Sequence, residues 1–243
     1  MKEKIQKILS NCGLESRRNI EKKINLGLLK VNGKLVFLGE RFRKKDIKYI
    51  IFNKKKFFLK NDCIKIIMYN KPIGEICTTK DAFGRTTVFK NLPKLLNSKW
   101  ISVGRLDINT SGLLLFTNFG ELAYRLMHPS YMIKREYLVQ VSGKVLKKKI
   151  FMLLSGIKIN NSISKFYEVT MIQNQKKNKW YKVSLFQGKN KEVRLLWNAV
   201  NITVHRLIRI SYGPIQLPKN LKLGTFVKLS TLEKKNLIKL VNL

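Results

Sequence analysis

The residues from Gly104 to Gly120 place the tightest constraint on how this chain can fold. Their centre, Leu113 to Phe116, is a short apolar run bounded by turn-forming residues, which is typical of a fully buried strand. Asp107 precedes this run in a polar, glycine-flanked loop, where the scaffold holds it and a ligand can reach it. If the chain is extended there, Arg105 shares a face with Asp107. Most loop aspartates instead accept main-chain hydrogen bonds in a turn, so both roles stay open for Asp107.

The charge balance indicates the chemical class of the partner. The 243 residues include 50 Lys and Arg against 14 Asp and Glu, which gives a formal net charge of +36. A chain this basic favours a polyanion, and RNA or DNA ranks above an anionic membrane surface. Lys, Asn and Ile are abundant together, as AT-biased coding produces, so composition as well as binding can account for the charge. The sign of the charge is therefore a better guide than its size.

The cysteines and histidines argue against a metal site or a disulfide framework. Cys12, Cys63 and Cys77 are widely separated and form no CxxC pair, which is typical of reduced thiols. Neither His128 nor His205 has a second His or Cys at ligand spacing. The first residues lack an apolar signal-peptide core, and no apolar run of about 18 residues occurs. We therefore expect no metal, no secretion signal, no membrane span and a cytoplasmic location.

Residues 1–61 have the pattern of a small, separate module. Apolar residues at positions i, i+3, i+4 and i+7 mark one face of a first helix, namely Ile5, Ile8, Leu9 and Cys12. Gly13 is placed to end this helix as a C′ glycine does. Ser16 is placed to cap a second helix, which carries the basic residues Arg17, Arg18 and Lys22. The Asn32-Gly33 pair then predicts a hairpin within residues 29–35.

Residues 62–243 are long enough for a second, larger domain with its own core. The sequence predicts strands at 64–70, 74–79, 113–116, 137–142, 166–173, 180–186, 203–211 and 226–229. It predicts helices at 121–127 and 145–154, a helix capped by Asn190, and a last helix that begins with a capping box of Ser230 and Glu233. Strand runs with scattered helices and no βαβ alternation predict an α+β fold with a mostly antiparallel sheet.

Several motifs follow one another along this larger domain. They are YNKPIG at 69–74, GRLDINTSGLLLFTNFG at 104–120, LMHP at 126–129, KREY at 134–137 and QGKNKEVR at 187–194. In content and order they resemble bacterial ribosomal RNA pseudouridine synthases of the small-subunit-enzyme type. Residues 74–78, 194–197 and 206–209 are most similar to the members that act on the large ribosomal subunit. Residues 1–61 resemble the S4 RNA-binding domain, so the likeness covers nearly the whole chain.

The resemblance implies isomerisation of one uridine to pseudouridine in 23S ribosomal RNA. That reaction breaks the N1–C1′ bond, rotates the uracil and rejoins it through C5, so it needs no redox step, metal or cofactor. By resemblance Asp107 is the carboxylate that acts on the sugar or base. Tyr137 would stack on the flipped uracil, and Arg194 would pair with Asp107 and keep it ionised. From the residues alone, a core tyrosine and an ordinary surface arginine are the alternatives.

The resemblance also assigns supporting and RNA-binding positions. The supporting residues are Lys71, Pro72, Gly104, Thr110 and Gly112, of which Lys71 and Pro72 would support Tyr137 rather than react. The RNA-binding residues are Arg17, Arg18, Lys22, Arg105, Lys189 and Lys191. Arg17 and Arg18 suit phosphate because a helix N-terminus offers free N–H groups, although a solvated helix face is the alternative. Lys189 and Lys191 stand where relatives usually carry Arg, and Lys lacks the planar fork of a guanidinium.

Other functions remain open at this point. A paralogous enzyme could modify another ribosomal RNA site, including one in the small subunit. A ribosome-assembly factor could bind ribosomal RNA without catalysis, although a pure binder has no need of Asp107, Tyr137 and Arg194 together. For the implied activity the expected partner is ribosomal RNA of the large subunit or its assembly intermediate, and we expect a monomer.

Overall fold

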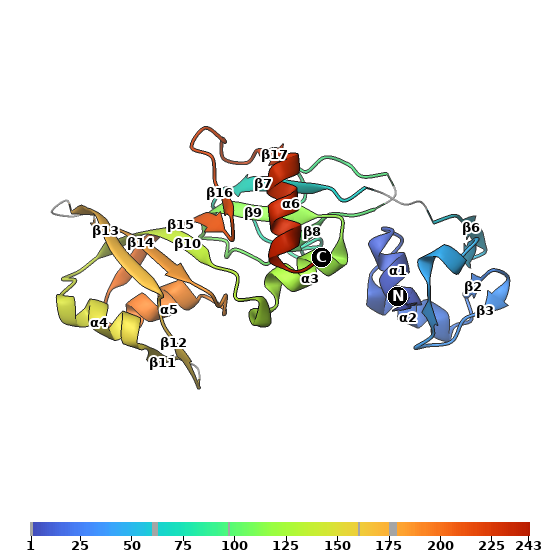
Figure 1. The fold of residues 1–243 in the computed structure, drawn as a ribbon, viewed down its shortest axis with the longest axis horizontal. Helices are drawn as coiled ribbons and strands as arrows, with labels where there is room; N and C mark the ends of the chain where they lie inside the picture. The colour runs from blue at the N-terminus through green and yellow to red at the C-terminus, as the bar shows by residue number, and fades with distance from the viewer. Residues whose placement is uncertain (1, 60–62, 97, 160, 175–178) are drawn as a thin grey trace. The chain divides into compact units, whose positions relative to one another are not determined.

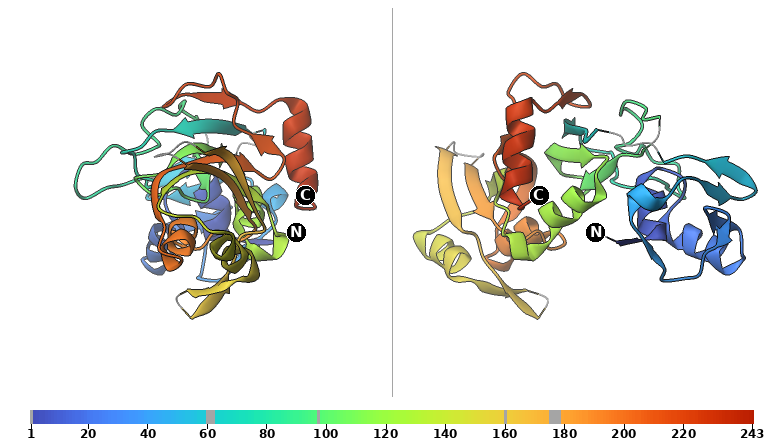
Figure 2. Two further views of the ribbon diagram at one scale, coloured as in Figure 1. Left: turned by 90° about the vertical axis from the view of Figure 1, so that its left-hand side faces the viewer. Right: turned by 45° about the vertical axis from the view of Figure 1, so that its right-hand side comes forward.

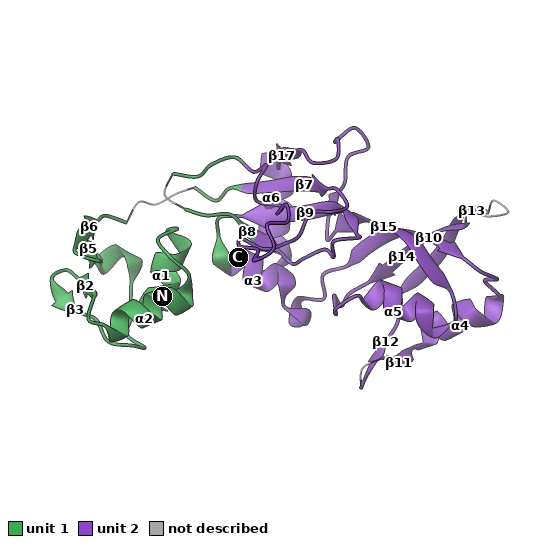
Figure 3. Ribbon diagram, turned by 180° about the vertical axis from the view of Figure 1, so that it is seen from behind, with its two compact units in different colours: residues 1–65, 93–101, 118–120 green, residues 66–92, 102–117, 121–243 purple. Residues whose placement is uncertain are grey.

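The computed structural model describes residues 2–59, 63–96, 98–159, 161–174 and 179–243 (Figure 1). The chain forms two compact units, shown in different colours in Figure 3. The first comprises residues 1–65 with two short later segments, 93–101 and 118–120, and the second comprises residues 66–92, 102–117 and 121–243. In the part of the chain that the structure describes, no helix is long and apolar enough to cross a membrane.

The first unit is built from two helices and short strands, in line with the sequence pattern. Its elements are β1 (Glu3–Lys4), α1 (Ile5–Asn11), α2 (Arg17–Asn25), β2 (Leu29–Val31), β3 (Lys34–Leu35), β4 (Arg41–Phe42), the 3₁₀ turn η1 (Lys44–Asp46), β5 (Ile50–Phe52) and β6 (Lys55–Phe57). The Ser16 hydroxyl accepts a hydrogen bond from the N–H of Asn19 over 3.3 Å and caps α2, as predicted. Asn32 and Gly33 have φ angles of +50° and +87° and form the tight turn between β2 and β3.

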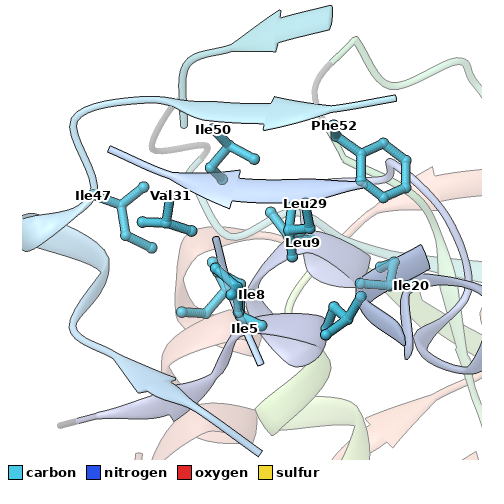
Figure 4. Packing of buried hydrophobic residues seen from close by; sticks show 11 residues of the cluster. Ile5, Ile8, Leu9, Ile20, Leu29, Val31, Ile47, Ile50 and Phe52 are labelled. Carbon is cyan, nitrogen blue, oxygen red and sulfur yellow. The ribbon is translucent and has the colours of Figure 1, made fainter. Parts of the chain in front are cut away.

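One apolar cluster holds the first unit together. Side chains from α1 and α2 point toward those from β2 and β5, as Figure 4 shows. The buried members are Ile5, Ile8, Leu9, Ile20, Ile24, Leu29, Val31, Val36, Ile47, Ile50 and Phe52. The helical spacing that predicted the inner face of α1 therefore identified three of its core residues, Ile5, Ile8 and Leu9.

The second unit is organised around one mixed sheet. Its strands run in the order β13-β14-β10-β15-β9-β7-β17, and two further strands, β8 and β16, pair with β9 and β15. Their bounds are β7 (Ile66–Lys71), β8 (Ile101–Val103), β9 (Ser111–Thr117), β10 (Arg135–Ser142), β13 (Glu168–Asn174), β14 (Lys179–Leu185), β15 (Thr203–Tyr212), β16 (Ile215–Gln216) and β17 (Phe226–Lys228). The main pairings are antiparallel except that of β9 with β15, which is parallel. The predicted α+β fold with a mostly antiparallel sheet is thus confirmed.

Helices cover this sheet, and a hairpin extends from it. They are α3 (Gly120–Met127), α4 (Lys147–Ser155), α5 (Glu192–Ala199) and α6 (Thr231–Leu240), with the 3₁₀ turn η2 (Pro129–Tyr131) and the hairpin of β11 (Ile157–Ile159) and β12 (Ser162–Ser164). Figure 2 shows α4 and α5 on the same face of the β10–β14–β13 part of the sheet. Trp197 on α5 is fully buried, and its ring lies 5.3 Å from that of Tyr181 on β14. Ser230 and Glu233 form the predicted capping box at the start of α6.

Three local predictions differ from the structure. Residues 74–79 form no strand, because Ile76 makes only an isolated bridge with Thr87. Residues 104–107 are not extended strand, so the argument that placed Arg105 and Asp107 on one strand face does not apply. Asn190 does not cap α5, since the chain takes a left-handed turn at Lys191 and the helix begins one residue later. The Glu192 carboxylate instead accepts a hydrogen bond from the N–H of Lys189 over 3.0 Å.

Candidate active site

The turn from Asp107 to Thr110 is held through its main-chain carbonyl groups. The N–H of Thr110 donates to the Asp107 carbonyl over 3.0 Å and closes the turn. The N–H of Gly74 donates to the Ile108 carbonyl over 2.9 Å, so the YNKPIG segment is tied to the same turn. Because hydrogen bonds reach every carbonyl from 107 to 110, the backbone beneath the Asp107 carboxylate is fixed.

Lys71 supplies two of these hydrogen bonds from the end of β7. Its ammonium is fully buried and donates to the carbonyls of Pro72 at 2.9 Å, Asp107 at 3.2 Å and Thr110 at 2.9 Å. Burial lowers the pKa of Lys71 from its ordinary value, because the charged form is desolvated. Lys71 is therefore a buried anchor for the Asp107 loop, whereas the resemblance had implied a support for Tyr137.

Arg194 anchors the same loop from α5. Its Nη2 donates to the Asn109 carbonyl over 2.8 Å, and its Nη1 donates to the Val204 carbonyl over 2.9 Å. Among the described residues, no ion pair within 4.0 Å joins Arg194 to the carboxylate of Asp107. In place of the expected ion pair, one terminal nitrogen of the Arg194 guanidinium contacts the main chain of the loop and the other contacts the main chain of β15.

A cavity of about 510 Å³ opens in front of this loop. Asp107 lines it from the loop and is only partly exposed, while Tyr137 lines it from β10 and is 7% exposed. In the part of the chain that the structure describes, no group donates a hydrogen bond to the Asp107 carboxylate. A fixed carboxylate without an internal partner therefore faces a cavity that also contains an aromatic ring.

One row of paired residues crosses four neighbouring strands and includes two residues that line the cavity, Tyr137 and Arg209. Tyr137 on β10 lies opposite Arg209 on β15, Arg209 is in register with Gly112 on β9, and Gly112 is in register with Lys71 on β7. Gly112 has a φ of +102°, and a Cβ there would lie 2.3 Å from the Arg209 carbonyl oxygen. The glycine is therefore required by both its backbone conformation and the close approach of β15.

A β-bulge brings two further residues to the cavity that the sequence analysis did not single out. On β10, Arg135 and Tyr137 are two residues apart and so share a face, and their partners on β15 are Tyr212 and Arg209. Those partners are three residues apart and would alternate in a regular strand, but the irregularity between them resets the register. All four side chains line the cavity. No period in the sequence could reveal this, because the bulge depends on pairing with β10.

The basic residues predicted to bind RNA fall into different environments. Arg105 and Lys191 are exposed at the cavity, and Arg105 also lines a second cavity of about 440 Å³ that shares Asp107. The Lys189 ammonium instead donates to the Ser162 hydroxyl at 2.8 Å, the Ile163 carbonyl at 3.1 Å and the Ser164 hydroxyl at 3.1 Å. Lys189 thus ties the β11–β12 hairpin to the cavity edge. Its RNA-binding role stays a prediction.

The remaining residues singled out in the sequence lie in both units. Arg17, Arg18 and Lys22 are exposed on α2 in the first unit. Gly104 has a φ of +78° and lines the cavity, and Thr110 is buried in its wall. Pro72 follows the last residue of β7, where its missing N–H leaves no gap in the ladder. Among the described residues, no three His, Cys, Asp or Glu side chains are grouped so that they could hold a metal ion.

A carboxylate on a fixed loop, a buried tyrosine and several cations surround one cavity, an arrangement typical of an enzyme active site. Residues 65–199 match the RNA pseudouridylate synthase family. The chain is 50% identical to ribosomal large subunit pseudouridine synthase B of Buchnera aphidicola subsp. Acyrthosiphon pisum, over 100% of this chain and 99% of that protein. It is 46% identical to the protein of that name from Yersinia pestis, over 94% of this chain and 73% of that one. A crystal structure of a pseudouridylate synthase superposes with a TM-score of 0.67 at 25% identity, covering 96% of this chain and 99% of that chain.

The chain therefore belongs to the RNA pseudouridylate synthase family. The family resemblance drawn from the motifs is confirmed. The likeness of residues 1–61 to the S4 domain was not tested by these comparisons and stays a prediction.

Proposed function

We propose that this protein isomerises one uridine to pseudouridine in large-subunit ribosomal RNA. The observation that carries the proposal is the Asp107 carboxylate, which has no internal partner in the described residues while its backbone is held at every carbonyl of the turn. Relatives at 46–50% identity carry the name of a large-subunit enzyme, which supports the choice of RNA.

The reaction requires few protein groups beyond those that line this cavity. The N1–C1′ bond breaks, the uracil turns within the cavity, a bond forms from C1′ to C5, and the C5 proton moves to N1. Asp107 supports the first step, either by attack at C1′ or by assisting elimination at the sugar. Tyr137 stacks on the uracil and holds it while it is detached. A cavity of about 510 Å³ has room for one nucleoside.

The target base has to leave its stack in the RNA before it can enter the cavity. Flipping a base costs a few kcal/mol, which stacking on Tyr137 and phosphate contacts offset. Exposed cations at the cavity, including Arg105 and Lys191, supply part of those contacts. We assign residues 1–61 to RNA affinity and residues 62–243 to catalysis, and we propose a monomer that works in the cytoplasm without a cofactor.

The test is to map pseudouridines in unmodified large- and small-subunit ribosomal RNA after incubation with the purified chain. We expect one new pseudouridine in the large-subunit RNA with the wild-type chain and none with Asp107→Asn. Affinity for RNA should change little, because it comes mostly from phosphate contacts. Asp46→Asn makes the same charge change at an exposed position outside the cavity and should retain full turnover.

Three other results would contradict the proposal. Modification of only the small-subunit RNA would identify a paralogous specificity. Tight binding without modification by the wild-type chain would identify a non-catalytic assembly factor. Substantial turnover by Asp107→Asn would rule out the assigned role of the carboxylate.

A further inference from the structure

A surface loop, residues 77–86, is tied to the segment that carries Asp107. The Cys77 thiol at its start donates to the Leu106 carbonyl over 3.3 Å and accepts a hydrogen bond from the Leu106 N–H over 3.4 Å. Leu106 directly precedes Asp107. The N–H of Ile76 donates over 3.0 Å to the carbonyl of the last loop residue and closes the loop at its base. The loop therefore starts and ends at fixed points beside the candidate active site.

Within this loop, Asp81 holds the guanidinium of Arg85 in one orientation. The Asp81 carboxylate accepts hydrogen bonds from the main-chain N–H of Phe83 over 3.2 Å and of Arg85 over 2.8 Å. It also accepts from the Arg85 side chain, from Nε over 3.1 Å and from Nη2 over 2.7 Å. These bonds to Arg85 lower the pKa of Asp81 to about 2, so the carboxylate stays ionised. Arg85 is thus preorganised, whereas a solvated arginine samples many rotamers.

The Arg85 guanidinium keeps one edge available to a ligand. The edge formed by Nε and Nη2 faces Asp81, and the ring of Phe83 lies 5.1 Å from the guanidinium carbon. Nη1 donates to no group in the described part of the chain, and the Arg85 side chain is 49% exposed. A ligand can therefore approach the guanidinium without displacing a protein contact.

Arg125 shows what a purely structural arginine with the same spacing looks like. It pairs with Glu121 four residues earlier, over 3.1 Å, and its Nη1 donates to the carbonyls of Val241 and Asn242. Its guanidinium is thus used by the protein on both sides. Exposed ion pairs contribute little to stability, so the consequence of the pair in loop 77–86 is the fixed direction of Arg85.

The surroundings of Arg85 indicate the chemistry of the ligand. Arg85 lines the second cavity of about 440 Å³, and the exposed cations Lys80 and Arg105 line it as well. Among the described residues, no ion pair within 4.0 Å neutralises Lys80 or Arg105. Cations gathered at one cavity repel each other, and an anion between them removes that repulsion. A phosphodiester of RNA supplies the anion, and its oxygens accept the parallel N–H groups of a guanidinium.

The position of the second cavity indicates which phosphodiester it receives. Asp107 lines both cavities, the first together with Tyr137 and the second together with Arg85. An RNA strand whose target nucleotide enters the first cavity therefore brings an adjacent phosphodiester to the second. The sugar that links the two groups then lies beside Asp107.

We propose that Arg85 binds a phosphodiester next to the target uridine in the second cavity, and that Asp81 positions the Arg85 guanidinium for this contact. The inference rests on the proposed function and adds an RNA contact beyond the cations assigned above. The contact holds the strand on one side of the flipped nucleotide, so that its sugar stays within reach of the Asp107 carboxylate.

The first test measures how binding depends on salt, with pentauridylate as the probe and the full chain as the protein. Fluorescence anisotropy gives the affinity over a range of salt concentrations. Loss of one phosphate contact with a single strand makes the slope of log affinity against log salt shallower by about 0.7, and we expect that change in Arg85→Met. Arg206→Met removes the same charge from an exposed position that lines neither cavity and should change the slope much less. Equal slopes in the wild type and Arg85→Met would overturn the proposal.

A second variant separates positioning from net charge. Asp81→Asn raises the net charge of the chain by one, so general electrostatic attraction would tighten the binding of pentauridylate. A neutral amide holds the guanidinium less firmly than a carboxylate does, so we expect binding about threefold weaker instead. Tighter binding by Asp81→Asn would overturn the positioning role. If Arg85→Met does not fold, Arg85→Lys takes its place, because one ammonium cannot hold Asp81 and a phosphate as a planar fork does.

The last test locates the phosphodiester on the RNA. In the fragment that contains the mapped uridine, each nearby phosphodiester is replaced in turn by a neutral methylphosphonate, and binding is measured in the Asp107→Asn background to prevent turnover. We expect one replacement next to the target to weaken binding about tenfold. With Arg85→Met added, that replacement should cost nothing further, whereas with Arg206→Met its cost should remain. Full additivity with Arg85→Met at every replaced position would overturn the proposal.

The same measurements distinguish this inference from the proposed function. If the wild-type chain modifies no ribosomal RNA, the proposed function fails, and the pentauridylate slopes still decide whether Arg85 contacts phosphate. If the wild-type chain modifies large-subunit RNA while the Arg85→Met slope is unchanged, the proposed function stands and this inference fails.

Discussion

Lys71 and Asp107 are joined by a hydrogen bond of 3.2 Å from a fully buried ammonium to a main-chain carbonyl. The contact fixes the backbone of the loop and leaves the Asp107 carboxylate free. A direct ion pair between the two side chains would have done the opposite, since it would hold the carboxylate that the proposed chemistry requires. Hydrogen bonds to the main chain thus fix the loop while the side chain proposed to act in catalysis stays available to a substrate.

Lys71→Met should weaken both the fold and the catalytic loop. The change leaves three carbonyl oxygens without the ammonium that they share. We expect the free energy of unfolding, measured with urea, to fall by about 1–3 kcal/mol. Turnover should fall more steeply than RNA affinity, because the loop that carries Asp107 loses an anchor. Equal losses in turnover and affinity would contradict this account.

The burial of Lys71 also predicts a pH dependence. Burial lowers its pKa in the folded state, so between that pKa and the ordinary value of 10.5 the unfolded chain holds a proton that the folded chain has released. In that window the unfolding free energy of the wild-type chain should rise with pH relative to Lys71→Met. Urea titrations of both proteins from pH 7 to pH 10.5 test the sign. A difference that falls with pH would contradict it.

Gly112→Ala should be among the most damaging small substitutions in the chain. A Cβ would meet the Arg209 carbonyl oxygen at 2.3 Å, and the φ of +102° is strained for alanine. We expect a loss of about 2–5 kcal/mol in unfolding free energy. Gly224→Ala is the matched control, since its φ is +75° but nothing lies within 4 Å of the added carbon. It should cost only about 1 kcal/mol, and equal losses would mean that the contact with β15 is unimportant.

Arg194 and Asp107 should show little direct coupling in their contributions to stability. Arg194→Ala removes two hydrogen bonds to carbonyl groups and should lower the unfolding free energy by about 1–3 kcal/mol. Because no ion pair within 4.0 Å joins the two side chains in the described residues, the double variant with Asp107→Asn should show a coupling energy below about 1 kcal/mol. Arg194→Lys should be more stable than Arg194→Ala but less stable than the wild type, since one ammonium can replace only part of the planar guanidinium. A coupling energy well above about 1 kcal/mol would instead indicate a direct ion pair between Arg194 and Asp107.

Arg17 and Arg18 should contribute RNA affinity without contributing chemistry. Both are exposed at the start of α2, where free N–H groups favour phosphate. The double alanine variant should make the dependence of log affinity on log salt shallower by roughly 1–1.5 for single-stranded contacts. Lys219→Ala with Lys222→Ala removes the same charge from exposed positions in the second unit and should change the slope less. Identical slopes in the two variants would mean that α2 does not contact the RNA backbone.

The sequence alone determined the features that depend on neighbours along the chain. The capping of α2 by Ser16, the Asn32-Gly33 turn and the buried strand 113–116 all follow from local steric and hydrogen-bonding preferences. The motifs identified the family in the same way, because they could be compared in order without any knowledge of the contacts.

Tertiary structure alone decided what those motif residues touch. Arg194 was expected beside the Asp107 carboxylate, but its donors reach the carbonyls of Asn109 and Val204. The bulge in β15 depends on pairing with β10, and it is this pairing that places Arg209 and Tyr212 on one face of the cavity. Residues 74–79 form no strand although their composition favoured one, because Ile76 finds only a single bridge partner. A hydrogen bond between distant residues forms where the fold brings donor and acceptor together, and no periodicity or local propensity encodes that meeting.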